Sequence, residues 1–171
     1  MRQIHKRKIL ITQKHLFLFI PLLLSGYTHL WNPVGFPDFS FDEGVYIRRA
    51  LHVLEGLGPQ EETAWYDHPF FGQLFLAFMF KIIGYPDSLH PKAGEVKSIE
   101  ILHLVPRVLM ALLAVLDTFF VYKIADKKYN RKVGFVASLL FAVMPSTWLL
   151  RRILLDSILL PFLLSSILLA I

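Results

Sequence analysis

The stretch that decides the fold is ILHLVPRVLMALLAVLDTFFVYKI, residues 101–124. As an α-helix it would be about 36 Å long at about 1.5 Å per residue. That exceeds the hydrocarbon core of a bilayer, which is about 30 Å thick. Its charged residues are Arg107, Asp117 and Lys123. The stretch is therefore predicted to be a transmembrane helix.

The composition of the whole chain points the same way. Of its 171 residues, 55% are hydrophobic and 18% are charged, and the mean hydropathy is +0.53. Soluble domains carry about 25% charged residues, so this composition argues against a globular cytosolic domain. The sequence has no cysteine, which excludes a disulfide-stapled module and a thiolate zinc site. The basic excess of 18 to 13 forms no patch beside stacking aromatics, so we predict no nucleic-acid partner.

Three further apolar segments accompany the central one, at residues 16–31, 133–150 and 153–171. The first follows five basic residues, which also fits a secretory signal, but no small-residue cleavage site follows it. We therefore favour an uncleaved first span. The predicted fold class is all-α: a polytopic membrane helix bundle with about four spans and additional juxtamembrane helices on its outer face.

The apolar piece at residues 69–83 is doubtful as a span, because it would be only about 22 Å long. Residues 126–132 read DKKYNRK, with four basic residues and one acid, which predicts a cytoplasmic location. The basic N-terminus is predicted to be cytoplasmic too, so an even number of spans must separate the two segments. Residues 69–83 are therefore predicted to lie in the interface without crossing.

This topology places the polar candidate residues on one outer face. In the loop at residues 32–68, seven acids stand against two arginines, which suits an outward location. The residues gathered there are Asp42, Glu43, Asp67, His68, Arg107, Arg151, Arg152 and Asp156. Such convergence indicates a site.

Each part of that site also has a structural explanation. Ser40-Phe41-Asp42-Glu43 fits a capping box that starts a helix, so the two acids are explained by capping alone. Asp67-His68 suits a phosphate, a sugar hydroxyl or a metal, or simply a polar turn, and two ligands do not make a metal site. The arginines at the span ends either snorkel to lipid headgroups or bind an anion.

Asp117 lies deep inside its predicted span, where an ionised carboxylate is costly. A proton relay is one reading. A hydrogen bond to another helix is the prediction we favour.

Taken together, these motifs resemble the N-terminal part of the polyprenyl-phosphate-dependent glycosyltransferases of the GT-C type. Protein O-mannosyltransferases and lipid A aminoarabinose transferases are the most similar members. The motifs that carry the resemblance are the basic first span, DEGVY at residues 42–46, YDHPFFG at 66–72, Arg107, and RRILLD at 151–156. The resemblance covers nearly the whole chain from Trp31 onward.

The resemblance implies a membrane glycosyltransferase that moves a sugar from a polyprenyl-phosphate carrier to an acceptor hydroxyl, with inversion, outside the cytoplasm. Asp42 is implied as the base, with Glu43 positioning it or the acceptor. Implied substrate-binding residues are Tyr46, Asp67, His68, Arg107, Arg151, Arg152 and Asp156. Asp156 corresponds to an acid that binds a divalent metal in oligosaccharyltransferase relatives, but the metal stays unassigned here.

The implied partners are a lipid-linked sugar donor and a protein or lipid hydroxyl acceptor in the plasma membrane or endoplasmic reticulum. Family members have roughly a dozen spans, so the chain is expected to be an N-terminal portion, with a first outer loop at residues 31–100 and spans two to four at 101–171. A non-catalytic membrane subunit that binds polyprenyl phosphate is the alternative. A transporter is a third reading, but it lacks visible paired repeats.

Overall fold

The computed structural model describes residues 2–58 and 70–171, with side chains from residue 15 onward. The elements in chain order are α1 (Arg2–Leu30), α2 (Phe41–Leu54), α3 (Phe70–Ile83), η1 (Asp87–Leu89), α4 (Val96–Lys128), α5 (Arg131–Val143), η2 (Pro145–Arg151) and α6 (Leu155–Ala170). All regular structure in these described ranges is helical. The predicted all-α class is confirmed.

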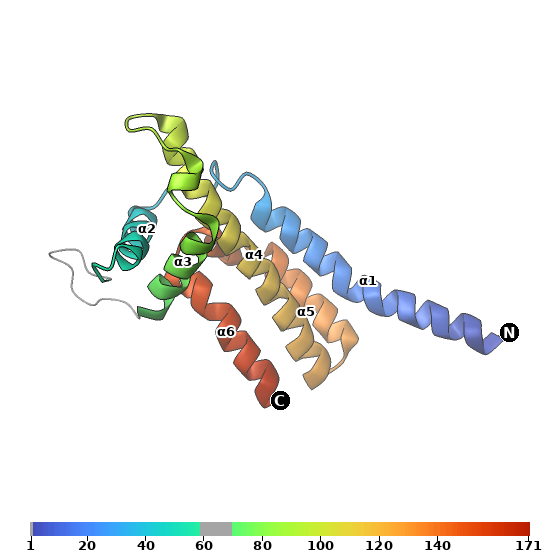
Figure 1. Cartoon of the computed structure of the whole chain (residues 1–171). Helices are drawn as coiled ribbons and strands as arrows, with labels where there is room; N and C mark the ends of the chain where they lie inside the picture. The colour runs from blue at the N-terminus through green and yellow to red at the C-terminus, as the bar shows by residue number, and fades with distance from the viewer. Residues whose placement is uncertain (1, 59–69) are drawn as a thin grey trace.

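The long helices form a bundle, and the short ones gather at one of its ends. Helix α4 packs against α1, α5 and α6, and α1 also packs against α5. Helices α2 and α3 pack on each other beside the first half of α4, and α3 also contacts α6 (Figure 1). The long first outer loop predicted from the sequence is therefore largely helical in its described part.

Helix α4 has the length and apolar composition of a membrane span, as predicted from residues 101–124. Within the described residues it is the single unbroken helix with both properties. The apolar part of α1, from His15 to Leu30, and helices α3 and α6 are apolar but shorter. The total of four spans, and the prediction that α3 does not cross, stay predictions.

The predicted span at residues 133–150 is broken. Helix α5 ends at Val143, and η2 leaves it at 66°. Pro145 begins η2, and a proline has no N–H to continue the α-helical ladder. Thr147 Oγ1 donates to the carbonyls of Phe141 at 2.8 Å and Met144 at 2.7 Å. The carbonyls near the break are thus hydrogen-bonded locally, and the chain changes direction there.

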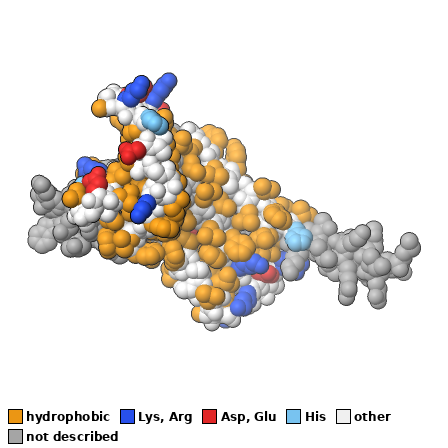
Figure 2. All heavy atoms as spheres, in the orientation of Figure 1, with side chains coloured by type: hydrophobic (Ala, Val, Ile, Leu, Met, Phe, Trp, Pro, Cys, Tyr) orange, Lys and Arg blue, Asp and Glu red, His pale blue; other side chains and the backbone are white. Residues whose placement is uncertain are grey.

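Helices α4 and α5 meet closely at Gly134. A Cβ atom at that position would lie 2.9 Å from the Tyr122 carbonyl oxygen, so only glycine allows this approach. Asn130 caps α5 by accepting from the N–H groups of Lys132 and Val133. Figure 2 shows basic side chains at this end of the bundle and charged side chains at the far end, with a largely hydrophobic surface between.

The core lies where α2, α3, α4 and α6 meet. Its buried side chains include Tyr46 and Ile47 of α2, Phe80 of α3, Met110 of α4 and Ile158 of α6. Burial of such apolar surface is the main force that fixes α2 against the bundle. The first turn of α2 is therefore held in a defined place beside α4.

Candidate functional site

The predicted capping box at the start of α2 is present. Ser40 is the N-cap, and its backbone N–H donates to Glu43 Oε1 at 3.0 Å. Helix α2 ends at Leu54, and Gly56 and Gly58 follow with φ of +77° and +78°. The helix start predicted from the sequence is thus confirmed.

Glu43 and Arg107 form a buried ion pair between α2 and α4. Arg107 Nε donates to Glu43 Oε2 at 2.8 Å, and Arg107 Nη2 donates to Glu43 Oε1 at 2.7 Å. Both side chains have 0% exposure. Two parallel N–H to oxygen bonds of this kind are the strong, geometrically specific form of an arginine–carboxylate contact.

The remaining donors of Arg107 hold the segment that precedes α2. Nη1 donates to the carbonyls of Pro33 and Pro37, each at 2.7 Å, and Nη2 donates to the Asp38 carbonyl at 3.2 Å. A guanidinium has five N–H donors, so every one is used inside the protein. The guanidinium carbon also lies 4.7 Å from the centre of the Phe39 ring. Arg107 therefore has no free donor for a substrate phosphate in this arrangement.

The surroundings of Glu43 keep it ionised. Burial alone would raise the pKa of Glu43, but hydrogen bonds from Arg107 and Ser40 and the charge of Arg107 hold the pKa below its ordinary value. The backbone N–H of Ile153 also donates to Glu43 Oε2, at 3.2 Å. Glu43 thus joins three segments: the start of α2, the first half of α4 and the short segment before α6.

Asp42 is the exposed neighbour of this pair. It lies in the first turn of α2, near the positive end of the helix dipole. The ion pair of the next residue fixes the backbone from which the Asp42 side chain projects. The two acids proposed together from the sequence therefore have different surroundings: one is exposed and the other is buried and paired.

The predicted arginines at positions 151 and 152 lie close to the Glu43–Arg107 pair. Arg152 Nη2 donates at 3.3 Å to the Asp38 carbonyl, the same oxygen that accepts from Arg107. Arg151 is 1% exposed and donates to the carbonyls of Thr28, at 3.2 Å, and Trp31. Asp156 is exposed in the first turn of α6. The structure thus brings Glu43, Arg107 and Arg152 together, while their location on an outer face and their roles in a site stay predictions.

Other predicted residues fall elsewhere. Tyr46 is 7% exposed and belongs to the core cluster. Asp67 and His68 lie outside the described residues, so their predicted contacts stay predictions. In the part of the chain with described side chains, no group of three or more His, Asp or Glu residues could hold a metal ion.

The prediction that Asp117 hydrogen-bonds to another helix is wrong for the described residues. Asp117 has 0% exposure, yet neither carboxylate oxygen has a partner among them. The link between helices is made by the next residue, since Thr118 Oγ1 and Ser25 Oγ lie 2.7 Å apart. Ser25 Oγ is in turn 3.2 Å from His29 Nδ1, a histidine to which the sequence reading gave no role.

The sequence reading also missed the carbonyl oxygens of Pro33, Pro37 and Asp38 as partners for the arginines. The two prolines were the available signal, because closely spaced prolines keep a segment out of helix and leave its carbonyls unpaired. A buried arginine nearby satisfies such carbonyls.

Comparison with known proteins identifies the family of this chain. A family model described as dolichyl-phosphate-mannose-protein mannosyltransferase matches residues 60–171. No curated protein and no solved structure gives a match. The matched range contains α3 to α6 and with them Arg107 and Arg152, while Asp42 and Glu43 precede it. The match covers well over half of the sequence, so the chain belongs to the dolichyl-phosphate-mannose-protein mannosyltransferase family.

Proposed function

We propose that this chain carries the catalytic base of a membrane glycosyltransferase that moves mannose from a polyprenyl-phosphate carrier to a protein hydroxyl. Asp42 is the base. The observation that carries the proposal is the exposed carboxylate of Asp42 on a turn that the Glu43–Arg107 pair fixes to the helix bundle. The family match supports the donor and acceptor classes through its name.

In the proposed reaction the acceptor oxygen attacks the anomeric carbon from the face opposite the phosphate. The new carbon–oxygen bond forms as the bond from carbon to the phosphate oxygen breaks, so the anomeric configuration inverts. The acceptor proton passes to the Asp42 carboxylate, and the carrier leaves as a phosphate monoester. A base within hydrogen-bond reach of the attacking hydroxyl contributes typically 10²–10⁴-fold to the rate.

Glu43 and Arg107 act in this proposal as positioning residues. Their bidentate contact is buried, and it ties the first turn of α2 to α4 at 2.7–2.8 Å. Catalysis depends on holding the base in place, because small displacements of a reacting group cost large factors in rate. The Ile153 N–H contact extends the same fixation to the segment that leads to Asp156.

Arg152 is the cation that suits the departing phosphate. It is half-buried, it donates through Nη2 to Asp38, and its Nε has no partner in the described part of the chain. Negative charge builds on the phosphate as the sugar leaves, and a fixed guanidinium stabilises that charge. Arg107 uses its donors elsewhere, so Arg152 replaces it in this role. The roles of Tyr46, Asp67, His68 and Asp156 in binding stay predictions.

The test is Asp42→Asn in membranes that express the protein, measured as transfer of labelled mannose from dolichyl phosphate mannose to an acceptor peptide. We expect kcat to fall at least about 100-fold, because asparagine cannot take the proton, while KM for the donor changes little. Asp87→Asn in η1 is the matched control, since Asp87 is also exposed, and we expect it to keep normal transfer.

A transfer rate above one tenth of normal in Asp42→Asn, at equal protein level, would remove Asp42 as the base. Loss of transfer in both variants would instead point to a general need for negative charge on this face, and would also contradict the assignment.

A further inference from the structure

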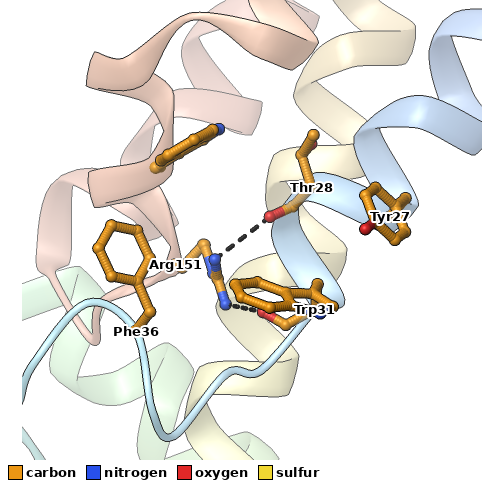
Figure 3. Close-up of a pocket in the computed structure, with 6 residues that line it drawn as sticks. Tyr27, Thr28, Trp31, Phe36 and Arg151 are labelled. Atoms are coloured by element: carbon orange, nitrogen blue, oxygen red, sulfur yellow. Dashed lines mark hydrogen bonds between the residues drawn. The ribbon is translucent and has the colours of Figure 1, made fainter.

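A cavity of about 340 Å³ opens where α1 ends and η2 begins to turn back. Its lining residues are Tyr27, Thr28, Trp31, Phe36, Trp148 and Arg151. Figure 3 shows Arg151 between Phe36 and Trp31, with its hydrogen bonds to the end of α1. The volume is within the ordinary range for pockets that hold small molecules, about 300–1,000 Å³.

Arg151 is a buried cation without a carboxylate partner. Two of its nitrogens donate to the carbonyls of Thr28 and Trp31, and its Nε has no partner in the described part of the chain. Within the same residues, no carboxylate oxygen forms an ion pair with it. The charge that acts on it is that of another cation, Arg107. Burying a charge is costly unless it is paired, so this guanidinium has room for an anion.

The other walls of the cavity are almost entirely aromatic. Tyr27 is 65% exposed, Trp31 56% and Phe36 41%, so the rim faces the surroundings of the bundle. Trp148 Nε1 is buried and has no partner among the described residues. Tryptophan and tyrosine gather at membrane–water interfaces, where their rings contact lipid and their polar atoms contact headgroups. The cavity thus combines two unpaired N–H donors with apolar walls.

None of the residues that line the cavity comes from α2, the helix that carries Asp42. In Figure 1, α1 and α2 stand on opposite sides of α4. Since α1 borders the outside of the bundle, the bilayer itself is the nearest source of an amphipathic anion.

We propose that this cavity binds an anionic phospholipid of the surrounding bilayer. The lipid phosphate accepts hydrogen bonds from Arg151 Nε and Trp148 Nε1, and the first part of an acyl chain lies among Tyr27, Trp31 and Phe36. The phosphate supplies the negative charge that Arg151 lacks. The proposal is independent of which residue acts as the base.

The test uses fluorescence of the purified protein in detergent, with lipids whose acyl chains carry bromine, which quenches nearby tryptophan. The chain has three tryptophans, two of which line the cavity, so a Trp65→Phe background leaves Trp31 and Trp148 as the reporters. Brominated phosphatidylglycerol is titrated against brominated phosphatidylcholine. We expect at least tenfold tighter binding of phosphatidylglycerol.

Variants connect the preference to the cavity. Arg151→Gln is expected to reduce the preference to less than twofold, while Arg151→Lys keeps most of it because the charge remains. Lys92→Gln removes an exposed positive charge outside the cavity and is expected to keep the full preference. Trp148→Phe leaves Arg151 in place and is expected to weaken phosphatidylglycerol binding severalfold, with Trp31 as the reporter. Circular dichroism checks that each variant is folded.

Three results would overturn the proposal. Equal quenching by both lipids would mean that the cavity accepts acyl chains without regard to charge. Displacement of phosphatidylglycerol by equimolar inorganic phosphate would mean that the site holds a free anion and needs no lipid. Displacement by a lower concentration of polyprenyl phosphate would assign the cavity to the sugar carrier.

Discussion

Two arginines at the same end of the bundle are equally buried and differ in what surrounds them. Arg107 has 0% exposure and Arg151 has 1%. Arg107 uses all five donors, two of them on the carboxylate of Glu43. Arg151 donates to two carbonyls, keeps Nε unpaired and has no carboxylate partner in the described residues.

The difference shows that burial alone does not define the role of an arginine. Arg107 is electrically balanced, so it fastens α2 and the preceding segment to α4 and is closed to ligands. Arg151 lies against the last carbonyls of α1, where the helix dipole provides only about half a negative charge. Its charge is partly balanced, which keeps the fold stable and leaves an attraction for an added anion.

The largest expected effect comes from breaking the balanced pair. Glu43→Gln removes the negative charge and leaves Arg107 buried without its counter-ion. Removing one partner of a buried ion pair typically costs about 3–5 kcal/mol. We expect a loss of that size in the free energy of unfolding, measured by denaturant titration in mixed micelles with circular dichroism.

The matched control is Glu55→Gln at the C-terminal cap of α2, where the side chain is exposed. Surface changes of this kind usually shift stability by less than about 0.5 kcal/mol. The double variant Glu43→Gln with Arg107→Met is expected to recover part of the loss. If it is no more stable than Glu43→Gln alone, the two side chains do not act as a pair.

Much of the fold was predictable because the sequence signals are local. The span at residues 101–124 follows from its apolar length, and the α2 start follows from Ser40 and Glu43 as a capping box. The break at Pro145 was less predictable, because a proline inside an apolar run is compatible with either a kink or a full stop. Whether the helix kinks or stops depends on whether the Thr147 hydroxyl can donate to the carbonyls left unpaired near the proline. That depends on the tertiary structure.

The proximity of some candidate residues was predictable, but their arrangement was not. Topology placed Glu43, Arg107 and Arg152 on one face, and the structure brings them together. Which acid is exposed and which is paired depends on the register of α2 against α4, and no local pattern encodes that register. The prediction of a helix-to-helix bond for Asp117 was wrong by one position, since Thr118 faces Ser25.

The stability of the Glu43–Arg107 pair is expected to depend on pH. The pKa of Glu43 is held below its ordinary value by Arg107 and two backbone donors despite burial, so the folded protein binds fewer protons than the unfolded chain. Stability from this group is complete above the unfolded pKa of about 4.3. It is lost as the pH falls through the lower folded pKa.

Unfolding titrations from pH 7 to pH 3 are therefore expected to show falling stability below about pH 4.5. Glu43→Gln removes this part of the dependence, so its stability curve is flatter in the same window. A curve as steep as that of the normal protein would assign the acid sensitivity to other carboxylates.

The smallest expected effect is that of Arg151→Gln in detergent without added phospholipid. The variant loses hydrogen bonds to Thr28 and Trp31, each worth about 1 kcal/mol, and it also relieves a buried charge that has no carboxylate partner. These changes oppose each other, so we expect a net loss below about 1 kcal/mol. A loss as large as that of Glu43→Gln would mean that Arg151 is as well balanced as Arg107, and the contrast between them would fail. Added phosphatidylglycerol is expected to stabilise the normal protein, because a ligand that binds the folded state raises its stability with concentration. The stability of Arg151→Gln is expected to stay unchanged under the same addition.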